Sequence, residues 1–222
     1  YTSYGPLTQK LLLFTRLSSF IYFSCASLLI DNIVHHDWDF HYFTTWNLYL
    51  LSTFYLLAFS ASVIGLCSQG KYAKASPPRR KLGMAVHMLY ELSGSAAFLV
   101  TVVAYTLLDH SFSFWNMSIH LITSGCSLLE LLLNHMPVFP VHCLLNVLWA
   151  GTYLIFIWAM VTTGVVDGWP YPFLATDTSS CFLWYSGMLV GCVGFYFVFE
   201  ELSRFKLRCH DSYLQSHEQN AE

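Results

Sequence analysis

Residues 42–66 read YFTTWNLYLLSTFYLLAFSASVIGL, a run of 25 residues that contains no Asp, Glu, Lys or Arg. A transmembrane helix needs about 20 predominantly apolar residues. The run is continuously apolar instead of alternating between apolar and polar residues, which favours a helix over a strand of a membrane barrel. It therefore predicts one complete membrane-spanning helix.

Five further runs meet the same criterion of length and apolar character. Together with the first they predict six spans, at residues 11–30, 42–66, 84–108, 116–133, 141–165 and 180–199. The predicted fold is all-α, a polytopic membrane bundle of six transmembrane helices. We expect residues 1–208 to form this single domain and residues 209–222 to form a short polar C-terminal tail.

The composition agrees with a chain that lies mostly in lipid. Of the 222 residues, 55% are hydrophobic and only 10% are charged, whereas soluble domains are roughly one quarter charged. This balance argues against a soluble enzyme, a secreted disulfide scaffold and a nucleic-acid-binding protein. We expect membrane lipids as partners, no nucleic acid and no cofactor. The sequence begins with Tyr1 instead of Met, as is typical of a processed or truncated chain, so the compartment stays open between endomembranes, plasma membrane and organelles.

Basic residues gather on one side of the predicted topology. With six spans, the start of the first span, the second connecting loop and the end of the sixth span all face the same compartment. These three places hold every Lys and Arg of the chain: Lys10, Arg16, Lys71, Lys74, Arg79, Arg80, Lys81, Arg204, Lys206 and Arg208. The positive-inside rule then predicts both termini on the cytoplasmic-type side. Arg16, inside the first span, is expected to extend its guanidinium to the nearby surface.

Ionisable residues inside predicted spans are costly and invite a functional hypothesis. On the cytoplasmic half, His87 and Glu91 share a helix face, and Glu130 lies near the inner end of the fourth span. Two interpretations stay open. The first is a hydrogen-bonded clamp between helices, and the second is a metal or proton site that also uses His135 or His142.

A second polar group is predicted on the outer half of the bundle. Thr44 and Thr45 begin the second span, and Asn116 and His120, one turn apart, begin the fourth. Thr44 lies about two residues and His120 about four residues below the outer boundary, so their depths agree within roughly 3 Å. If the second and fourth helices are neighbours, the hydroxyl and the imidazole meet at one level.

Such a pair permits nucleophilic acyl transfer. A Thr hydroxyl attacks a carbonyl when a neighbouring base takes its proton, and a neutral imidazole is the usual base. Asn116 would donate to the developing oxyanion and Asp109 would orient the imidazole. The structural alternative is that Thr44 or Thr45 is a helix N-cap and that His120 is a hydrogen-bonded histidine at a helix interface.

Three stretches resemble the related rolling-stone and androgen-induced-gene (AIG/ADTRP-type) families of multi-pass membrane proteins. They are Tyr42-Phe43-Thr44-Thr45-Trp46, Asn116-Met117-Ser118-Ile119-His120 and Tyr171-Pro172-Phe173-Leu174. Their order covers residues 10–200, and the first stretch is closer to the rolling-stone branch. The androgen-induced branch contains membrane threonine hydrolases that cleave fatty acid esters of hydroxy fatty acids. That resemblance implies Thr44 as nucleophile, His120 as its partner and a lipid ester as substrate.

Two other functions remain as alternatives. The rolling-stone branch implies a role in cell fusion, so the chain is alternatively a non-catalytic scaffold, such as a fusion factor or an accessory subunit with partner subunits in a large membrane complex. A haem, metal or proton carrier using His87, His120 and His142 is disfavoured, because His120 is predicted at the opposite membrane face. The outer loop 166–174 is rigidified by two prolines. It is expected to place Trp169, Tyr171 and Phe173 at headgroup level, as an anchor or as a lateral entry for a lipid chain.

Overall fold

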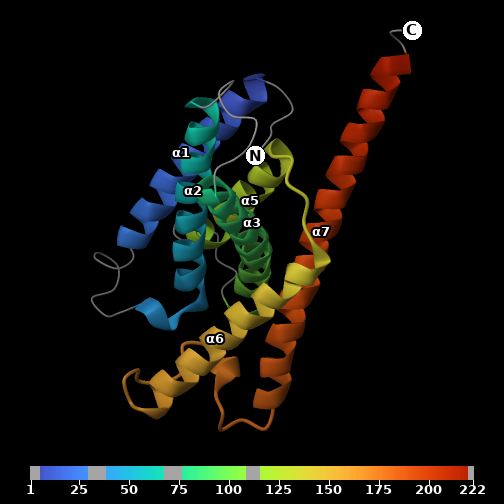
Figure 1. Cartoon of the computed structure of the whole chain (residues 1–222). Helices are drawn as coiled ribbons and strands as arrows, with labels where there is room; N and C mark the ends of the chain where they lie inside the picture. Colours follow the sequence, from blue (N-terminus) through green and yellow to red (C-terminus); the bar gives the residue numbers. More distant parts are fainter. Residues whose placement is uncertain (1–5, 30–38, 68–76, 109–115, 220–222) are drawn as a thin grey trace.

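The computed structural model describes residues 6–29, 39–67, 77–108 and 116–219, and all regular structure in these ranges is helical (Figure 1). The predicted all-α class is therefore confirmed. The α-helices are α1 (Pro6–Leu29), α2 (Phe43–Cys67), α3 (Pro77–Val103), α5 (Ile122–Leu133), α6 (Cys143–Thr162) and α7 (Cys181–Gln219). Short helices are η2 (Asp39–His41), η3 (Ala104–Leu108), η4 (Met117–Leu121), η5 (Pro140–His142) and η6 (Pro172–Leu174).

Within the described residues, five helices are long and apolar enough to cross a membrane. They include α1, α2, α3 continued by η3, α6 preceded by η5, and α7. The sixth apolar helix, η4 continued by α5, runs from Met117 to Leu133 and is shorter. The chain is thus a multi-pass integral membrane protein, and a helix lies at the position of each predicted span, five of them long enough to cross a membrane.

The bundle is organised around α3. This helix packs against α2, α5, α6 and α7, while α1 packs against α2 and α5. In Figure 1, α6 runs diagonally across the lower part of the molecule to meet α7, and α7 extends beyond the other helices toward its C-terminal end. Residues 209–219 of the predicted polar tail belong to this continuous helix.

Close approach of α3 and α7 depends on one glycine. A Cβ placed on Gly94 would lie 2.5 Å from Cζ and 2.9 Å from Cε2 of Phe199. Both residues are buried, and the Phe199 ring also packs on Tyr90 with ring centroids 5.3 Å apart. The absence of a side chain at Gly94 therefore lets the ring of Phe199 sit directly against the α3 backbone.

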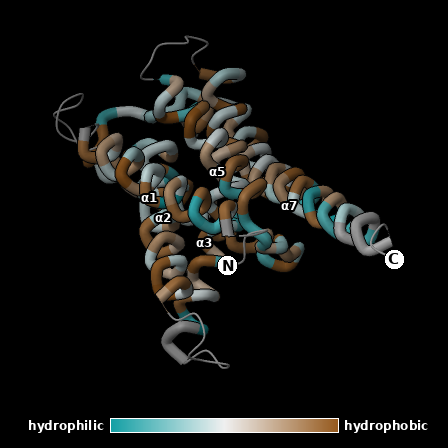
Figure 2. Tube along the Cα trace, turned by 90° about the horizontal axis from the view of Figure 1, so that it is seen from above, coloured by the Kyte–Doolittle hydropathy of each residue, from teal (hydrophilic) through white to brown (hydrophobic). Residues whose placement is uncertain are grey.

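The bundle buries many polar side chains beside its apolar core and exposes many large apolar side chains on its outside. Buried polar residues include Asn47, Glu91, Glu130, Asn134 and Asn146. Large apolar side chains are exposed on the outer faces, among them Phe14, Leu148, Ile155, Phe182 and Val190. Figure 2 shows hydrophobic segments along every labelled helix. This is the pattern expected in lipid, where apolar side chains lose nothing by facing outward and polar groups need partners inside.

The prediction that Arg16 reaches the membrane surface is wrong. Its side chain is 0% exposed and forms an ion pair with Glu130 on α5, with two Nε–Oε distances of 3.1 Å. Its guanidinium also donates to the hydroxyl of Ser62 at 2.5 Å and to the carbonyl of Ala58 on α2. Because the neighbouring helix α5 offers the buried Glu130 carboxylate, the Arg16 guanidinium forms an ion pair inside the bundle and is not hydrated at the surface.

The polar residues that the sequence predicts on the cytoplasmic half divide into two separate groups, although the sequence suggested one. Glu130 pairs with Arg16, whereas Glu91 joins α3 to the start of α6. Glu91 accepts the backbone N–H of Phe139 at 2.8 Å and lies 3.1 Å from Nε2 of His87, with Nδ1 of His142 on its other oxygen. In the part of the chain that the structure describes, no three His, Cys, Asp or Glu side chains are arranged to hold a metal ion. The contacts of Glu91 correspond to the first interpretation of these residues, a hydrogen-bonded clamp between helices.

Candidate functional site

A cavity of about 190 Å³ is lined by α2, α3, α7, the two short helices η3 and η4, and the loop that holds Tyr171 and Phe173. Its lining is almost entirely apolar, and the exceptions are Thr44, His120 and Tyr171. The described lining consists of Phe43, Thr44, Leu99, Val100, Val103, Ala104, Leu107, Leu108, His120, Tyr171, Phe173, Trp184, Gly187 and Met188. Two residues predicted from the sequence, Thr44 and His120, therefore share one cavity.

Thr44 is the second residue of α2. The turn before it is held from two sides, because the indole Nε1 of Trp46 donates to the carbonyl of Phe40 and the hydroxyl of Tyr153 donates to the carbonyl of His41, both at 2.8 Å. Phe43 is buried and its ring packs on that of Tyr153. These contacts hold the turn that leads into the first turn of α2.

His120 lies on η4, a π-helical segment, and is 8% exposed. Its backbone carbonyl accepts two hydroxyls, that of Thr101 on α3 at 2.6 Å and that of Thr123 on α5. The Thr101 hydroxyl also lies 2.7 Å from that of Ser124, which donates to the carbonyl of Ala97. A chain of hydroxyls thus attaches the His120 backbone to α3.

The adjacency that the sequence left open is present in the structure. α2 contacts η4 directly, which brings the helix that carries Thr44 beside the helix that carries His120. The two π-helical segments η3 and η4 flank residues 109–115 and both contribute to the cavity. A π-helix turns each side chain relative to an α-helix of the same sequence, and such segments occur frequently at functional sites.

Tyr171 is the residue of this site that sequence reasoning missed. We expected it at headgroup level, but it is only 7% exposed and lines the cavity. Its phenol oxygen accepts the backbone N–H of Phe43 at 3.1 Å and interacts with the side chain and backbone of Thr44. Burial raises the pKa of Tyr171, and the hydrogen bonds with Thr44 and Phe43 offset part of that rise. The phenol is therefore neutral at physiological pH.

The conformation of the outer loop explains why Tyr171 points inward. Pro172 begins the short helix η6, in which the N–H of Leu174 donates to the carbonyl of Tyr171 at 2.9 Å. The ring of Tyr171 stacks on Phe173 with centroids 5.4 Å apart, and Leu174 is fully buried. Proline on each side of Tyr171 was the available signal, because it restricts the backbone there, but it does not reveal which side chain turns inward.

The remaining predicted residues lie elsewhere. Asn116 is 9% exposed at the start of η4 and is not part of the described lining. Thr45 is buried on another face of α2. Asp109, proposed to orient the imidazole, lies outside the described residues.

The cavity extends to exposed residues at the periphery of the bundle. Leu107 and Leu108 on η3 are 46% and 39% exposed, and they line the cavity together with the exposed Gly187 of α7. No atom lies within 4 Å of the position of a Cβ on Gly187. The part of the cavity wall formed by η3 and α7 therefore lies at the periphery of the bundle.

The arrangement places three protic side chains, a Thr hydroxyl, an imidazole and a phenol, in a cavity whose other walls are apolar. Groups of these types perform nucleophilic attack, proton transfer and stabilisation of developing negative charge. An apolar cavity with a few convergent polar groups is also the usual form of a small-molecule site. No protein-family model, no curated protein and no solved structure matches this chain.

Proposed function

We propose that this protein is an intramembrane threonine hydrolase of lipid esters, with Thr44 as nucleophile and His120 as base. The observation that carries the proposal is that these two side chains, from two different helices, line one apolar cavity. The resemblance of the stretches around Thr44, His120 and Tyr171 to the rolling-stone and androgen-induced-gene families supports the same roles. All three stretches contribute a residue to the cavity wall.

In the proposed reaction, His120 takes the proton of Thr44 while the Thr44 oxygen attacks the ester carbonyl carbon. The tetrahedral intermediate then expels the alcohol oxygen, which takes the proton from His120, and an acyl ester remains on Thr44. Water repeats the same sequence, with His120 as base, and releases the fatty acid. Both products are apolar enough to leave by the opening through which the substrate entered.

The dimensions of the cavity suit one hydrocarbon segment. A cavity of about 150 Å³ holds benzene, and this one measures about 190 Å³. We propose that a short segment next to the ester occupies the cavity and that the remaining chain extends through the opening between η3 and α7 into the bilayer. A fatty acid ester of a hydroxy fatty acid has this shape, with an ester flanked by long chains.

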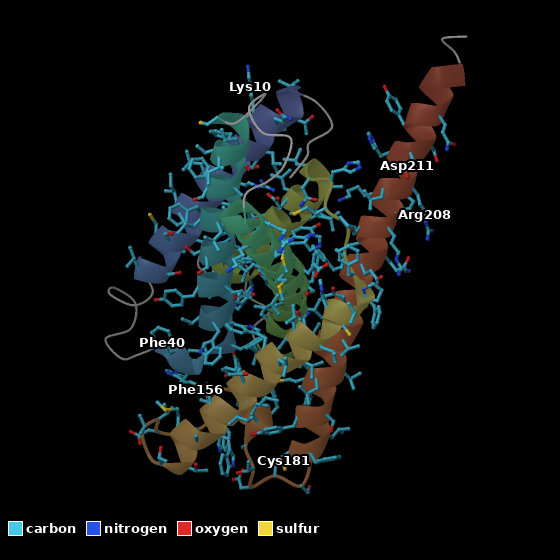
Figure 3. All side chains as sticks on the ribbon, viewed as in Figure 1. Lys10, Phe40, Phe156, Cys181, Arg208 and Asp211 are labelled. Carbon is cyan, nitrogen blue, oxygen red and sulfur yellow. The ribbon has the colours of Figure 1, made fainter. Side chains whose placement is uncertain are left out.

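We further propose that η4 and α5 form a sixth span, so that both termini face the cytoplasmic-type side. In Figure 3, Lys10 and Arg208 lie toward one end of the bundle, and Phe40, Phe156 and Cys181 lie toward the other. That distribution of basic residues supports the same orientation. Protease protection of tags at the two ends tests it, because opposite accessibility of the tags would exclude six spans.

A non-catalytic scaffold is the second candidate, and one observation favours it. The C-terminal part of α7 extends away from the bundle (Figure 2) and exposes Phe205 at 66% and Tyr213 at 60%. Exposed aromatic side chains on a projecting helix are typical of surfaces that bind other proteins. Co-purification with other subunits at fixed stoichiometry after mild solubilisation would favour this role.

The hydrolase proposal is tested by ester hydrolysis and by labelling with a fluorophosphonate probe. Thr44→Ala and His120→Ala should each remove nearly all activity, and the double variant should be scarcely worse than either, because groups that act as a unit are not additive. Thr45→Ala is the matched control and should retain activity. A wild-type chain that is folded, unlabelled and inactive on medium- and long-chain esters would exclude the hydrolase.

A further inference from the structure

We propose that Tyr171 is a catalytic residue of the same site, and that its phenol donates a hydrogen bond to the oxyanion formed during ester cleavage. This inference rests on the hydrolase function proposed above and assigns the one role that the Thr44–His120 pair leaves open. Attack on an ester moves a full negative charge onto the carbonyl oxygen, and that charge requires a donor fixed in advance.

The position of the Tyr171 hydroxyl fits this role. It lies at the first turn of α2, where it interacts with Thr44 and accepts the N–H of Phe43 at 3.1 Å. The carbonyl carbon under attack must approach the Thr44 oxygen, so its own oxygen forms within a few ångströms of the same phenol. The phenol lines the cavity that the substrate would occupy.

The hydrogen bond from Phe43 supports a donor role for the phenol. An incoming N–H occupies an acceptor position on the phenol oxygen and leaves the O–H proton to be donated. It also polarises that O–H, which strengthens the bond that the O–H makes. Because burial raises the pKa of Tyr171, the proton stays on the phenol over the pH range in which a His base works. The phenol donates a hydrogen bond and does not transfer its proton.

The backbone of the oxyanion donor is held rigidly. Tyr171 is fixed by the turn to Leu174, by stacking on Phe173 and by edge contact with Tyr42, whose ring centroid lies 5.9 Å away. A donor that does not reorganise during the reaction is the arrangement that stabilises a transition state best. Asn116, the donor suggested by the sequence, lies outside the described lining of the cavity.

A purely structural role for Tyr171 predicts different results. In that case the phenol only satisfies the N–H of Phe43 at the start of α2. Its removal would then lower the thermal stability and leave the turnover of the folded fraction unchanged. The hydroxyl of Tyr153 offers a matched control, since it is buried, bonds the carbonyl of His41 at the same end of the bundle and is not in the cavity lining.

The experiment compares Tyr171→Phe, Tyr153→Phe and Asn116→Ala in the purified full chain in lipid nanodiscs. The substrate is a fluorogenic ester of a medium-chain fatty acid, and kcat, KM and melting temperature are measured for each variant. The affinity of an alkyl trifluoromethyl ketone, which adds to the Thr hydroxyl and carries an oxyanion, is compared with that of the corresponding methyl ketone. The affinity of the trifluoromethyl ketone depends on stabilisation of the oxyanion, and the affinity of the methyl ketone measures binding of the alkyl chain alone.

We expect Tyr171→Phe to lower kcat about 100- to 1,000-fold, the usual effect of removing one oxyanion donor, with KM within threefold. Its affinity for the trifluoromethyl ketone should fall by a similar factor while methyl ketone affinity is kept. The kcat of Tyr153→Phe and of Asn116→Ala should stay within tenfold of the wild-type value. Full kcat in Tyr171→Phe, or an equal loss in Tyr153→Phe, would overturn the role of Tyr171 and leave the hydrolase standing. An inactive wild type that forms no ketone adduct would overturn both.

Discussion

Arg16 on α1 and Glu130 on α5 form an ion pair in the interior of the bundle, with side chains 0% and 1% exposed. Glu130 also accepts the side-chain amide of Asn134 at 3.2 Å, and Arg16 donates to Ser62 on α2. The pair thus connects α1, α2 and α5 near the end of the bundle that carries Lys10. Two buried charges that satisfy each other in this way are costly to separate.

Loss of one partner of this pair should destabilise the fold strongly. Arg16→Met leaves the Glu130 carboxylate buried without its cation, and we expect a cost of about 3–5 kcal/mol. The double variant Arg16→Met/Glu130→Leu removes both charges and should recover most of this loss. The melting temperatures of the wild type, the single variant and the double variant are measured in the same detergent. Lys10→Met, at an exposed position, is the control. Equal stability of the single and double variants would show that the pair does not couple α1 to α5.

A side chain at Gly187 should obstruct the proposed opening between η3 and α7. Gly187 has open space at its Cβ position, so Gly187→Leu adds bulk at the opening without a clash in α7. We expect weaker binding of a photoactivatable fatty acid and slower hydrolysis of long-chain esters at an unchanged melting temperature. Gly194→Leu makes the same change on the same helix, also in open space and away from the cavity, and should leave both measurements unaltered. Undiminished labelling of Gly187→Leu would mean that lipid enters elsewhere.

Even the smallest side chain at Gly94 should disturb the contact between α3 and α7. In Gly94→Ala the new methyl group meets the buried ring of Phe199, and relief requires a shift of the ring or of a helix. Overpacking of this kind costs about 1–3 kcal/mol. Gly125→Ala on α5, where no atom lies within 4 Å, should be neutral or slightly stabilising because Ala favours helices. The comparison of the two melting temperatures tests this close packing, and equal values would contradict it.

Glu91 should be important for stability and unimportant for hydrolysis. Glu91→Gln keeps the shape of the side chain but weakens its contacts with His87, His142 and the N–H of Phe139. We expect a loss of about 1–3 kcal/mol and unchanged kcat, because none of these residues lines the cavity. Glu201→Gln, at a side chain that is 61% exposed, is the control. If a folded Glu91→Gln variant lost hydrolysis, Glu91 would have to be assigned to the catalytic site.

The helices and their order could be predicted from the amino-acid sequence. Hydropathy is a local property that adds up along about 20 residues, so runs such as 42–66 identify helices without any knowledge of their neighbours. The depth of a residue along its span is equally local, because it depends only on counting from the boundary. For that reason Thr44 and His120 could be placed at one level before their helices were known to touch.

The contacts between side chains of different helices could not be predicted from the sequence and depend on how the helices pack. The rotation of each helix about its axis selects the partner, so Arg16 turned inward to Glu130, and Glu91 and Glu130 belong to separate groups. Neither the π-helical turns at η3 and η4 nor the inward direction of Tyr171 leaves a periodic signal in the sequence. These features depend on contacts between segments far apart in the chain, where packing and burial of polar groups outweigh local preference.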